Sequence, residues 1–372
     1  MQEIKQIFKP LKDPRSPRNK RHKFFDIMIL SILAVLSGAE SYEDIELFGN
    51  EKKDFLKKIL ELRNGIPSHD TINRLFQQLN PEEFEKCFLE FAEYLKSASI
   101  LKDHLKDHIA IDGKTCRGSR DTFKSKGPLH SVHAWSVGNS LCLGQVSCKD
   151  KTNEITNIPK LIDMLDIKDC VVTIDAIGTQ TAIVEQILLK GGDYILAVKA
   201  NQPSLLQKVH TICETAIPDF DSTSVEKNRG RIETRRVEVF KYNSKVHGSH
   251  WKYLNSVIKV SSTRETLDNK STKEADRYYI SNLEPRNDFG TFIRSHWEVE
   301  NKLHWVLDMT FREDACRKRT KHATANFALV RKMTLNILKK DTRKGSLKGK
   351  RLKAGWNNKY LLELLGTYTR LF

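Results

Sequence analysis

Two apolar runs of the sequence each end at an aspartate. The run Ile-Ala-Ile precedes Asp112, and the run Val-Val-Thr-Ile precedes Asp175. Each run is typical of a buried β-strand, where a charge costs several kcal/mol unless it is compensated. If the two strands are neighbours, their carboxylates lie side by side, and the repulsion between them favours a shared proton or a bound divalent cation. Since the ligands are all oxygens, we expect Mg²⁺ or Mn²⁺ rather than zinc.

A third carboxylate is expected from a helix over 292–308. This segment carries an apolar stripe with the spacing of a buried face, made of Phe292, Val299, Leu303 and Val306. Glu300 lies at the margin of the stripe, so its carboxylate can face the two aspartates. Two Asp and one Glu can hold two Mg²⁺ ions, the arrangement that stabilises the attacking and leaving oxygens in phosphoryl transfer. On spacing alone, Glu298 and Glu313 compete with Glu300 for this role.

Other chemistries account for fewer of these residues. His296, Glu300 and His304 are spaced four residues apart and would share one helix face as zinc ligands. However, the H-E-x-x-H order is absent, and the paired aspartates would go unexplained. An acid at a strand end is often a turn or cap residue, and that alternative stays open for either aspartate. The sequence contains neither a G-x-S-x-G nucleophile motif nor a phosphate-binding glycine loop.

The elements that must position these acids follow from hydrophobic periodicity. Strands are expected at 108–112, 129–137 and 141–147, and Gly138-Asn139-Ser140 joins the last two as a hairpin. A helix at 155–165, a strand at 170–175, a helix at 181–190 and a strand at 194–198 follow. The first three strands predict an antiparallel meander, and the later ones alternate with helices. The fold class is therefore α/β with a mixed sheet.

The segments on either side of this core have different hydrophobic patterns. Residues 1–100 have helical spacing, and the apolar run at 27–36 is too short to cross a bilayer, which needs about 20 residues. We expect a buried helix there rather than a signal peptide. Ser41 with Asp44 predicts a capping box, and Ser68 predicts the start of another helix. The turn before that helix admits a helix-turn-helix on DNA, although ordinary helix packing produces the same pattern.

Beyond the central elements, residues 203–283 alternate loosely between polar and apolar and predict a β-rich insertion. Helices are expected again over 284–340, which completes a core begun at 101–202. The last segment, 341–372, is rich in Lys and Arg. It is expected to be a basic tail that either contacts DNA or acts as a disordered tether.

The composition of the chain restricts the class of its binding partner. The chain has 372 residues and a mass of 42.9 kDa, which suggests two or three domains, and its 39% hydrophobic content excludes general disorder. A net charge of +16 favours a polyanionic partner, most simply nucleic acid, and no membrane partner is expected. Seven cysteines without a C-x-x-C pair fit neither a disulfide framework nor a zinc ribbon, so we expect a reducing cytoplasm.

Several motifs together resemble those of the DDE transposases of bacterial insertion sequences, in the branch of H-repeat-associated proteins of Rhs elements. They are AIDGKT at 110–115, KTNEI at 151–155, TIDA at 173–176, GDY at 192–194, AVKANQ at 197–202 and HWEVENKLHW at 296–305. The resemblance covers nearly the whole chain. It implies a ribonuclease H-like core interrupted by a β-rich insertion, an N-terminal transposase-associated helical domain, and a catalytic and metal-binding triad of Asp112, Asp175 and Glu300.

The resemblance also implies residues that contact DNA. They are Lys114, Lys199, Asn201, Gln202, Arg229, Arg231, Arg294, His296 and Lys302. Related transposases place an Arg directly before the Trp of the glutamate helix and a Lys seven residues after the Glu, where this chain has His296 and Leu307. Arg294 and Lys302 are the nearby cations that can substitute. Arg229 stands where related proteins commonly carry His.

The implied activity is Mg²⁺- or Mn²⁺-dependent cleavage of DNA at the ends of an insertion sequence, followed by transfer of the freed 3′-OH into target DNA. Bringing two ends together implies at least a homodimer, acting at the nucleoid. Two alternatives remain open. The protein could be a DNA-binding regulator or a domesticated, inactive transposase, or it could be a ribonuclease H-like nuclease or resolvase that cuts without joining.

Overall fold

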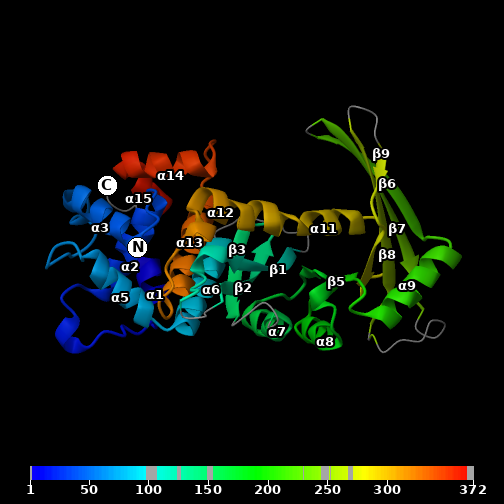
Figure 1. The fold of residues 1–372 in the computed structure, drawn as a ribbon, viewed down its shortest axis with the longest axis horizontal. Helices are drawn as coiled ribbons and strands as arrows, with labels where there is room; N and C mark the ends of the chain where they lie inside the picture. The colour runs from blue at the N-terminus through cyan, green and yellow to red at the C-terminus, as the bar shows by residue number, and fades with distance from the viewer. Residues whose placement is uncertain are drawn as a thin grey trace.

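The computed structural model describes residues 2–366 except 98–106, 124–126, 149–153, 229, 244–250, 252 and 267–270. Within these residues, a layer of helices from the two ends of the chain lies beside the central sheet, and a group of long strands forms the opposite end (Figure 1). One long helical segment runs between the two ends. The expected α/β class with a mixed sheet is confirmed.

The N-terminal region is helical, as its spacing predicts. Its helices are α1 (Gln2–Phe8), α2 (Phe24–Leu36), α3 (Tyr42–Glu51), α4 (Lys53–Leu56), α5 (His69–Gln78) and α6 (Pro81–Ser97). Helix α2 is buried from Asp26 onward, because other helices cover its apolar surface on all sides. Among the described residues, no helix has the length and apolar character that a membrane crossing requires.

Local capping signals in this region are present in the structure. The Ser41 side chain accepts the N–H of Asp44, and the Asp44 carboxylate accepts the N–H of Ser41, so the expected capping box starts α3. The Ser68 side chain accepts the N–H of Thr71 at the start of α5. The interpretation of α5 as a DNA-reading helix stays a prediction.

The central strands have the order that the sequence predicts. The elements are β1 (His108–Cys116), β2 (Leu129–Ser136), β3 (Leu141–Cys148), α7 (Glu154–Met164), β4 (Val171–Ile174), α8 (Thr181–Leu189) and β5 (Asp193–Val198). The spatial order is β3-β2-β1-β4-β5. The first three strands are antiparallel, whereas β4 is parallel to β1 and β5 is parallel to β4. This is the ribonuclease H-like arrangement, and it makes the strands before the two aspartates direct neighbours.

The β-rich segment extends the same sheet. After α9 (Pro203–Thr215) come β6 (Phe220–Asn228), β7 (Arg231–Lys241), β8 (Ser256–Thr266), β9 (Ser271–Lys273) and β10 (Arg277–Ser281). Strand β10 pairs with β5, and β8, β7 and β6 follow outward, so ten strands form one sheet in the described part of the chain. The domain boundaries expected at 202–203 and 283–284 stay a prediction.

The helix expected over 292–308 is longer and less regular. It consists of α11 (Phe289–His296), a π-helical turn η5 (Val299–His304) and α12 (Trp305–Phe311). Figure 1 shows these elements as one run across the molecule, from the insertion strands to the N-terminal helices. Helix α13 (Ala323–Lys340) follows and is buried along most of its length. One apolar core joins α12, α13 and the N-terminal helices.

Alternation along β1 divides the two faces of the sheet. Ile109 and Ile111 belong to the apolar core under α7 and α8. Ala110 belongs to the core that contains Val299 and Leu303 of the long helical run. Because side chains two residues apart in a strand share a face, Asp112 lies on the same side as Ala110, toward that run.

Within residues 341–366, the C-terminal segment is folded onto the rest of the protein. It contains α14 (Leu347–Trp356) and α15 (Asn358–Leu364), and Tyr360 and Leu361 are buried in the core shared with the N-terminal helices. The disordered-tether alternative is therefore wrong for these helices. Arg351 is 6% exposed and donates to the carbonyl oxygens of Val35 and Ala39 at the end of α2, at 3.0 and 3.3 Å. It also donates to the carbonyl oxygen of Thr310.

Substituting Arg351→Met should therefore lower the free energy of unfolding by about 3 kcal/mol, since buried carbonyls at the end of α2 lose a charged donor. Urea unfolding at pH 7 measures the change. Lys348→Ala, an exposed cation on the same helix, is the control and should stay within about 0.5 kcal/mol of the wild type. Equal midpoints for Arg351→Met and the wild type would show that the hydrogen bonds from Arg351 to the end of α2 contribute nothing to stability.

Candidate active site

A cavity of about 420 Å³ opens between the sheet and the long helical run. Asp112, Asp175 and Glu300 all line it, together with side chains of β5, β10 and α11. The pairing of β1 with β4 stops at Ile111 and Ile174, immediately before the two aspartates. The structure thus brings together three acids that are far apart in the sequence.

Asp112 does not end its strand, contrary to the sequence-based expectation. Strand β1 continues to Cys116 because Gly113 and Lys114 keep pairing with Val132 and Ser131 of β2. Only its other neighbour, β4, stops at this level. The consequence for the site is the one expected, since the carboxylate still lies where the parallel pair of strands separates.

Asp175 begins a short 3₁₀ turn, η4 (Ala176–Gly178). Its carboxylate accepts the N–H of Ile177 at 3.2 Å. Asp175 therefore acts as a cap residue in this contact, as the alternative interpretation of a strand-end acid predicts. Two amides from the segment after β5 support the turn: Asn201 donates to the carbonyl oxygen of Ala176 at 2.7 Å, and Gln202 to that of Thr179 at 2.8 Å. These amide groups hold the backbone behind Asp175, and the expected contact of both residues with DNA stays a prediction.

A histidine that sequence reasoning considered only as a zinc ligand lies beside the acids. Potential ligand atoms of Asp112, Glu300 and His304 lie within 4.8 Å of one another, and Asp175 is outside this group. His304 Nδ1 is 3.6 Å from Asp112 Oδ2 and 3.5 Å from Glu300 Oε2, and its Nε2 is 3.0 Å from Nδ1 of buried His133. The four-residue spacing from Glu300 was the signal for His304, whereas nothing in the sequence pointed to His133.

The π-helical turn carries Glu300 at the cavity. Val299 and Leu303 are fully buried and anchor the turn, while the Glu300 side chain is 52% exposed. Such turns inside α-helices are rare and occur often at functional sites, because they re-aim side chains without breaking the helix. The margin position expected for Glu300 is thus present, in a segment whose irregularity the sequence did not indicate.

The carboxylates at the site repel one another. Burial, followed by the negative charges of Glu300 and Asp175, raises the pKa of Asp112 to about 8. The hydrogen bond to His304 is the main reason that the pKa of Glu300 is lowered. Carboxylates that crowd in this way are stabilised by a divalent cation, and oxygen ligands on an open cavity suit Mg²⁺ or Mn²⁺. The residues present therefore fit the expected metal.

The competing glutamates have other partners. Glu313 is 2% exposed and lies 3.5 Å from Lys332 and 4.0 Å from Lys114. Glu298 pairs with Lys302 at 2.7 Å. Neither lines the cavity. Of the three glutamates that spacing alone left open, the fold brings Glu300 to the two aspartates.

The zinc alternative is not supported by the arrangement. His296 lies outside the group of ligand atoms that includes His304, and its Nδ1 is 2.8 Å from the Thr173 hydroxyl. That hydroxyl is also 2.7 Å from Nε2 of His108. Burial lowers the pKa of His296 to about 4, so this side chain is neutral rather than cationic at pH 7. Its expected contact with DNA stays a prediction.

The expected DNA-contact cations occupy different surroundings. Lys114 is buried, and its Nζ lies 2.6 Å from Asp308 and 3.5 Å from Asp314, so internal carboxylates hold it. Lys199 is exposed and lines the cavity. Lys302 is 44% exposed beside Glu298. Arg229 lies outside the described residues.

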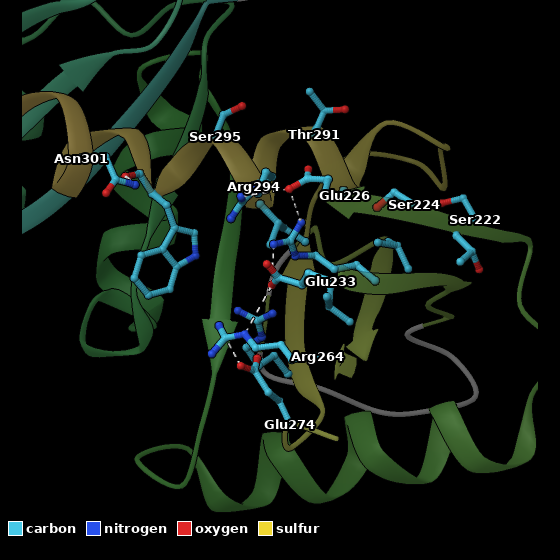
Figure 2. Close-up of a pocket in the computed structure, with 18 of the residues that line it drawn as sticks. Ser222, Ser224, Glu226, Glu233, Arg264, Glu274, Thr291, Arg294, Ser295 and Asn301 are labelled. Atoms are coloured by element: carbon cyan, nitrogen blue, oxygen red, sulfur yellow. Dashed lines mark hydrogen bonds and ion pairs between the residues drawn. The ribbon is translucent and has the colours of Figure 1, made fainter. Parts of the chain in front are cut away.

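A larger groove of about 1030 Å³ adjoins the cavity, between α11 and the insertion strands (Figure 2). Arg231 and Arg294 line it, and Arg294 points at Glu226, 3.2 Å away. Arg264 lies between Glu233 and Glu274 on the opposite wall. Trp297 is 49% exposed and lines both the groove and the cavity, so the two spaces are adjacent.

Comparisons with known proteins agree with this geometry. A family model described as "Transposase DDE domain" matches residues 103–337, and one described as "DDE_Tnp_1-associated" matches residues 5–92. "H repeat-associated putative transposase YhhI" of Escherichia coli K12 is 40% identical over 339 residues, 88% of each chain. "Putative transposase YncI" of Escherichia coli O157:H7 is 39% identical over 349 residues, 90% of this chain and 87% of the relative.

Among solved structures, a piggyBac transposase synaptic complex with hairpin DNA matches 99% of this chain and 77% of its own, at 11% identity and a TM-score of 0.43. That similarity is too low to carry an argument. The family-model match and the identities of about 40% suffice, and the expected resemblance to the H-repeat-associated branch is confirmed. The chain belongs to the DDE transposase family.

Proposed function

We propose that the protein cuts DNA at the ends of an insertion sequence and joins the freed 3′-OH to target DNA, using Asp112, Asp175 and Glu300. The observation that carries this proposal is that the three acids, from β1, the end of β4 and the π-helical turn, line one cavity. Membership of the DDE transposase family supports the same reaction class.

In this proposal, Asp112, Asp175 and Glu300 hold divalent cations. Bound Mg²⁺ would supply Lewis-acid stabilisation of the attacking and leaving oxygens. Asp112 is central because it faces both other acids. Asp175 would serve as a ligand with its carboxylate turned from the N–H of Ile177 toward the cavity, and Asn201 and Gln202 would keep the turn in place. His304 orients the carboxylates of Asp112 and Glu300.

The partner in this proposal is double-stranded DNA, both the terminal inverted repeats and the target. The net charge of +16 and the arginine-lined groove beside the cavity support it. Lys199, Arg231, Arg294 and Lys302 are the cations we propose for phosphate contacts; buried Lys114 is left out of that set. Joining two ends requires two catalytic centres, so we propose a homodimer that works at the nucleoid.

A cleavage and strand-transfer assay tests the proposal. Labelled duplexes bearing the inverted repeats that flank the coding region are incubated with protein, supercoiled target and either Mg²⁺ or EDTA. Nicked ends with a 3′-OH and joined products are expected with Mg²⁺ only. Binding without strand breakage would favour a regulator or an inactive transposase. Breakage without joining would favour a nuclease or resolvase.

A further inference from the structure

A second cavity, of about 530 Å³, lies where the N-terminal helices meet the segment after α12. Its walls are the start of α3, Asn73 of α5, the segment 312–320, and Ala323 and Arg331 of α13. Arg312 is 12 residues beyond Glu300 along the helical run, which corresponds to about 18 Å of helix axis. The cavity is therefore separate from the acidic site.

Two buried polar groups in its wall have no partner within the described part of the chain. Arg331 is 2% exposed, and its Nη1 has no hydrogen-bond partner. Tyr42 is 5% exposed, and its hydroxyl also has none. Most buried polar atoms in proteins are hydrogen-bonded. Two orphaned donors on one cavity therefore indicate an acceptor that binds there.

The surroundings of Arg331 show why that acceptor should be charged. Its guanidinium lies over the ring of Phe327, 4.6 Å from the centroid. The carboxylate that acts on it, Glu313, lies 3.5 Å from Lys332 and also acts on Lys114, which Asp308 and Asp314 hold as well, so Arg331 has only a share of its negative charge. A water molecule could accept a hydrogen bond from Arg331, but it would add no negative charge to compensate the guanidinium.

Other cations add to the positive potential of the cavity. Lys318 lies 4.0 Å from the ring centroid of Phe327 and donates to the carbonyl oxygen of Glu40 at 2.9 Å. Five cationic side chains line the cavity, against three carboxylates: Arg312, Arg317, Lys318, Arg319 and Arg331 against Glu40, Glu43 and Asp44. The Asp44 carboxylate is engaged in the capping box, and Glu40 lies 3.7 Å from Arg312. The remaining charge favours an anion.

We propose that this cavity binds a phosphate group of the DNA backbone, with Arg331 and Tyr42 donating to its oxygens. Lys318 and the arginines at the rim supply further charge. The anion site follows from the side chains alone, whereas DNA as the source of the phosphate depends on the proposed function. A duplex running along α12 rises about 3.4 Å per base pair, so this phosphate would lie about five base pairs from the one at the acidic cavity.

A DNA-binding assay in EDTA tests the assignment without catalysis. Fluorescence anisotropy measures the affinity for a 30-base-pair duplex at several salt concentrations. Arg331→Met should weaken binding roughly tenfold near 100 mM salt and reduce the slope of log K against log[salt] by about 0.9, the value for one lost phosphate contact. Tyr42→Phe removes only the hydroxyl, so affinity should fall roughly threefold with an unchanged slope. Lys160→Met, an exposed cation on α7 across the sheet, is the charge control and should leave affinity and slope unchanged.

Melting temperatures in anion-poor buffer separate binding from folding. The melting temperature of Arg331→Met should change little, because Glu313 keeps Lys332 as its partner at 3.5 Å while a buried cation with no hydrogen-bond acceptor at Nη1 is removed. If this variant does not fold, Tyr42→Phe and Arg317→Ala carry the test. Wild-type affinity and slope in the folded variants would overturn the proposal.

A further titration distinguishes the two sources of phosphate. Inorganic phosphate should raise the melting temperature of the wild type but not that of Arg331→Met. The same result combined with unchanged DNA binding by the variants would assign the cavity to free phosphate and overturn the DNA assignment. A wild type that binds no duplex at all would instead contradict the proposed function.

Discussion

Asp112→Asn is expected to abolish Mg²⁺-dependent cleavage and joining, with a rate loss of about 10³-fold or more. Asparagine keeps the shape of the side chain but removes the charge that two cations would share. A loss of that size corresponds to about 4 kcal/mol of transition-state stabilisation. Single-turnover cleavage of a labelled end duplex measures it. Cleavage at the wild-type rate would exclude this carboxylate from the mechanism.

Two readouts separate this effect from a damaged fold. DNA binding in EDTA should be retained, because the cations proposed for phosphate contacts are unchanged. In EDTA the variant should also melt higher than the wild type at pH 8. The raised pKa of Asp112 means that its ionisation opposes folding, so wild-type stability falls as the pH rises from the ordinary Asp range toward about 8. Asparagine does not ionise, and the variant should lack this fall.

Adding Mg²⁺ should raise the melting temperature of the wild type and have a smaller effect on Asp112→Asn. Glu298→Gln is the matched control, because this carboxylate is on the same helical run but pairs with Lys302 and does not line the cavity. It should cleave DNA and respond to Mg²⁺ nearly as the wild type does. Equal responses of all three proteins to Mg²⁺ would contradict a cation site at Asp112.

Glu313→Gln is expected to have the largest effect on stability, a loss of about 3–5 kcal/mol in the free energy of unfolding. Glu313 is 2% exposed, and the substitution leaves Lys332, 1% exposed, without its carboxylate. Removing one partner of a buried ion pair is costly because the other charge stays buried and uncompensated. Urea unfolding at pH 7 measures the loss, and Glu298→Gln should stay within about 0.5 kcal/mol.

The stabilising effect of Glu313 should depend on pH. Burial raises the pKa of Glu313, but the charges of Lys332, Lys114 and Arg331 outweigh burial and lower it below the ordinary value of 4.5. Its contribution is therefore present above the unfolded pKa and is lost as the pH falls through the folded value. The wild type should lose more stability than the variant as the pH falls below about 4.5. Parallel losses would show that Glu313 is not ionised in the fold.

The features that depend on local patterns could be predicted from the amino-acid sequence. Strand alternation and turn residues predict the order of the core strands along the chain, whereas the pairing of β1 with β4, which brings Asp112 and Asp175 to the same edge, was a condition that the sequence left open. The capping box at Ser41 and the buried helix at 27–36 follow from residues only a few positions apart. Such signals persist because backbone geometry repeats every two residues in a strand and every 3.6 in a helix.

Contacts between side chains far apart in the sequence could be identified only in the folded protein. Glu298, Glu300 and Glu313 are equivalent by spacing, and the packing of η5 on β1 brings Glu300 to the cavity. In the sequence Lys114 resembles a surface cation, but in the fold it is paired with Asp308 and Asp314. The basic C-terminal residues likewise resemble a tail, but in the fold Arg351 donates to a carbonyl oxygen of α2. These contacts join residues tens to hundreds of positions apart, and burial and pairing at that range depend on the whole fold rather than on periodicity.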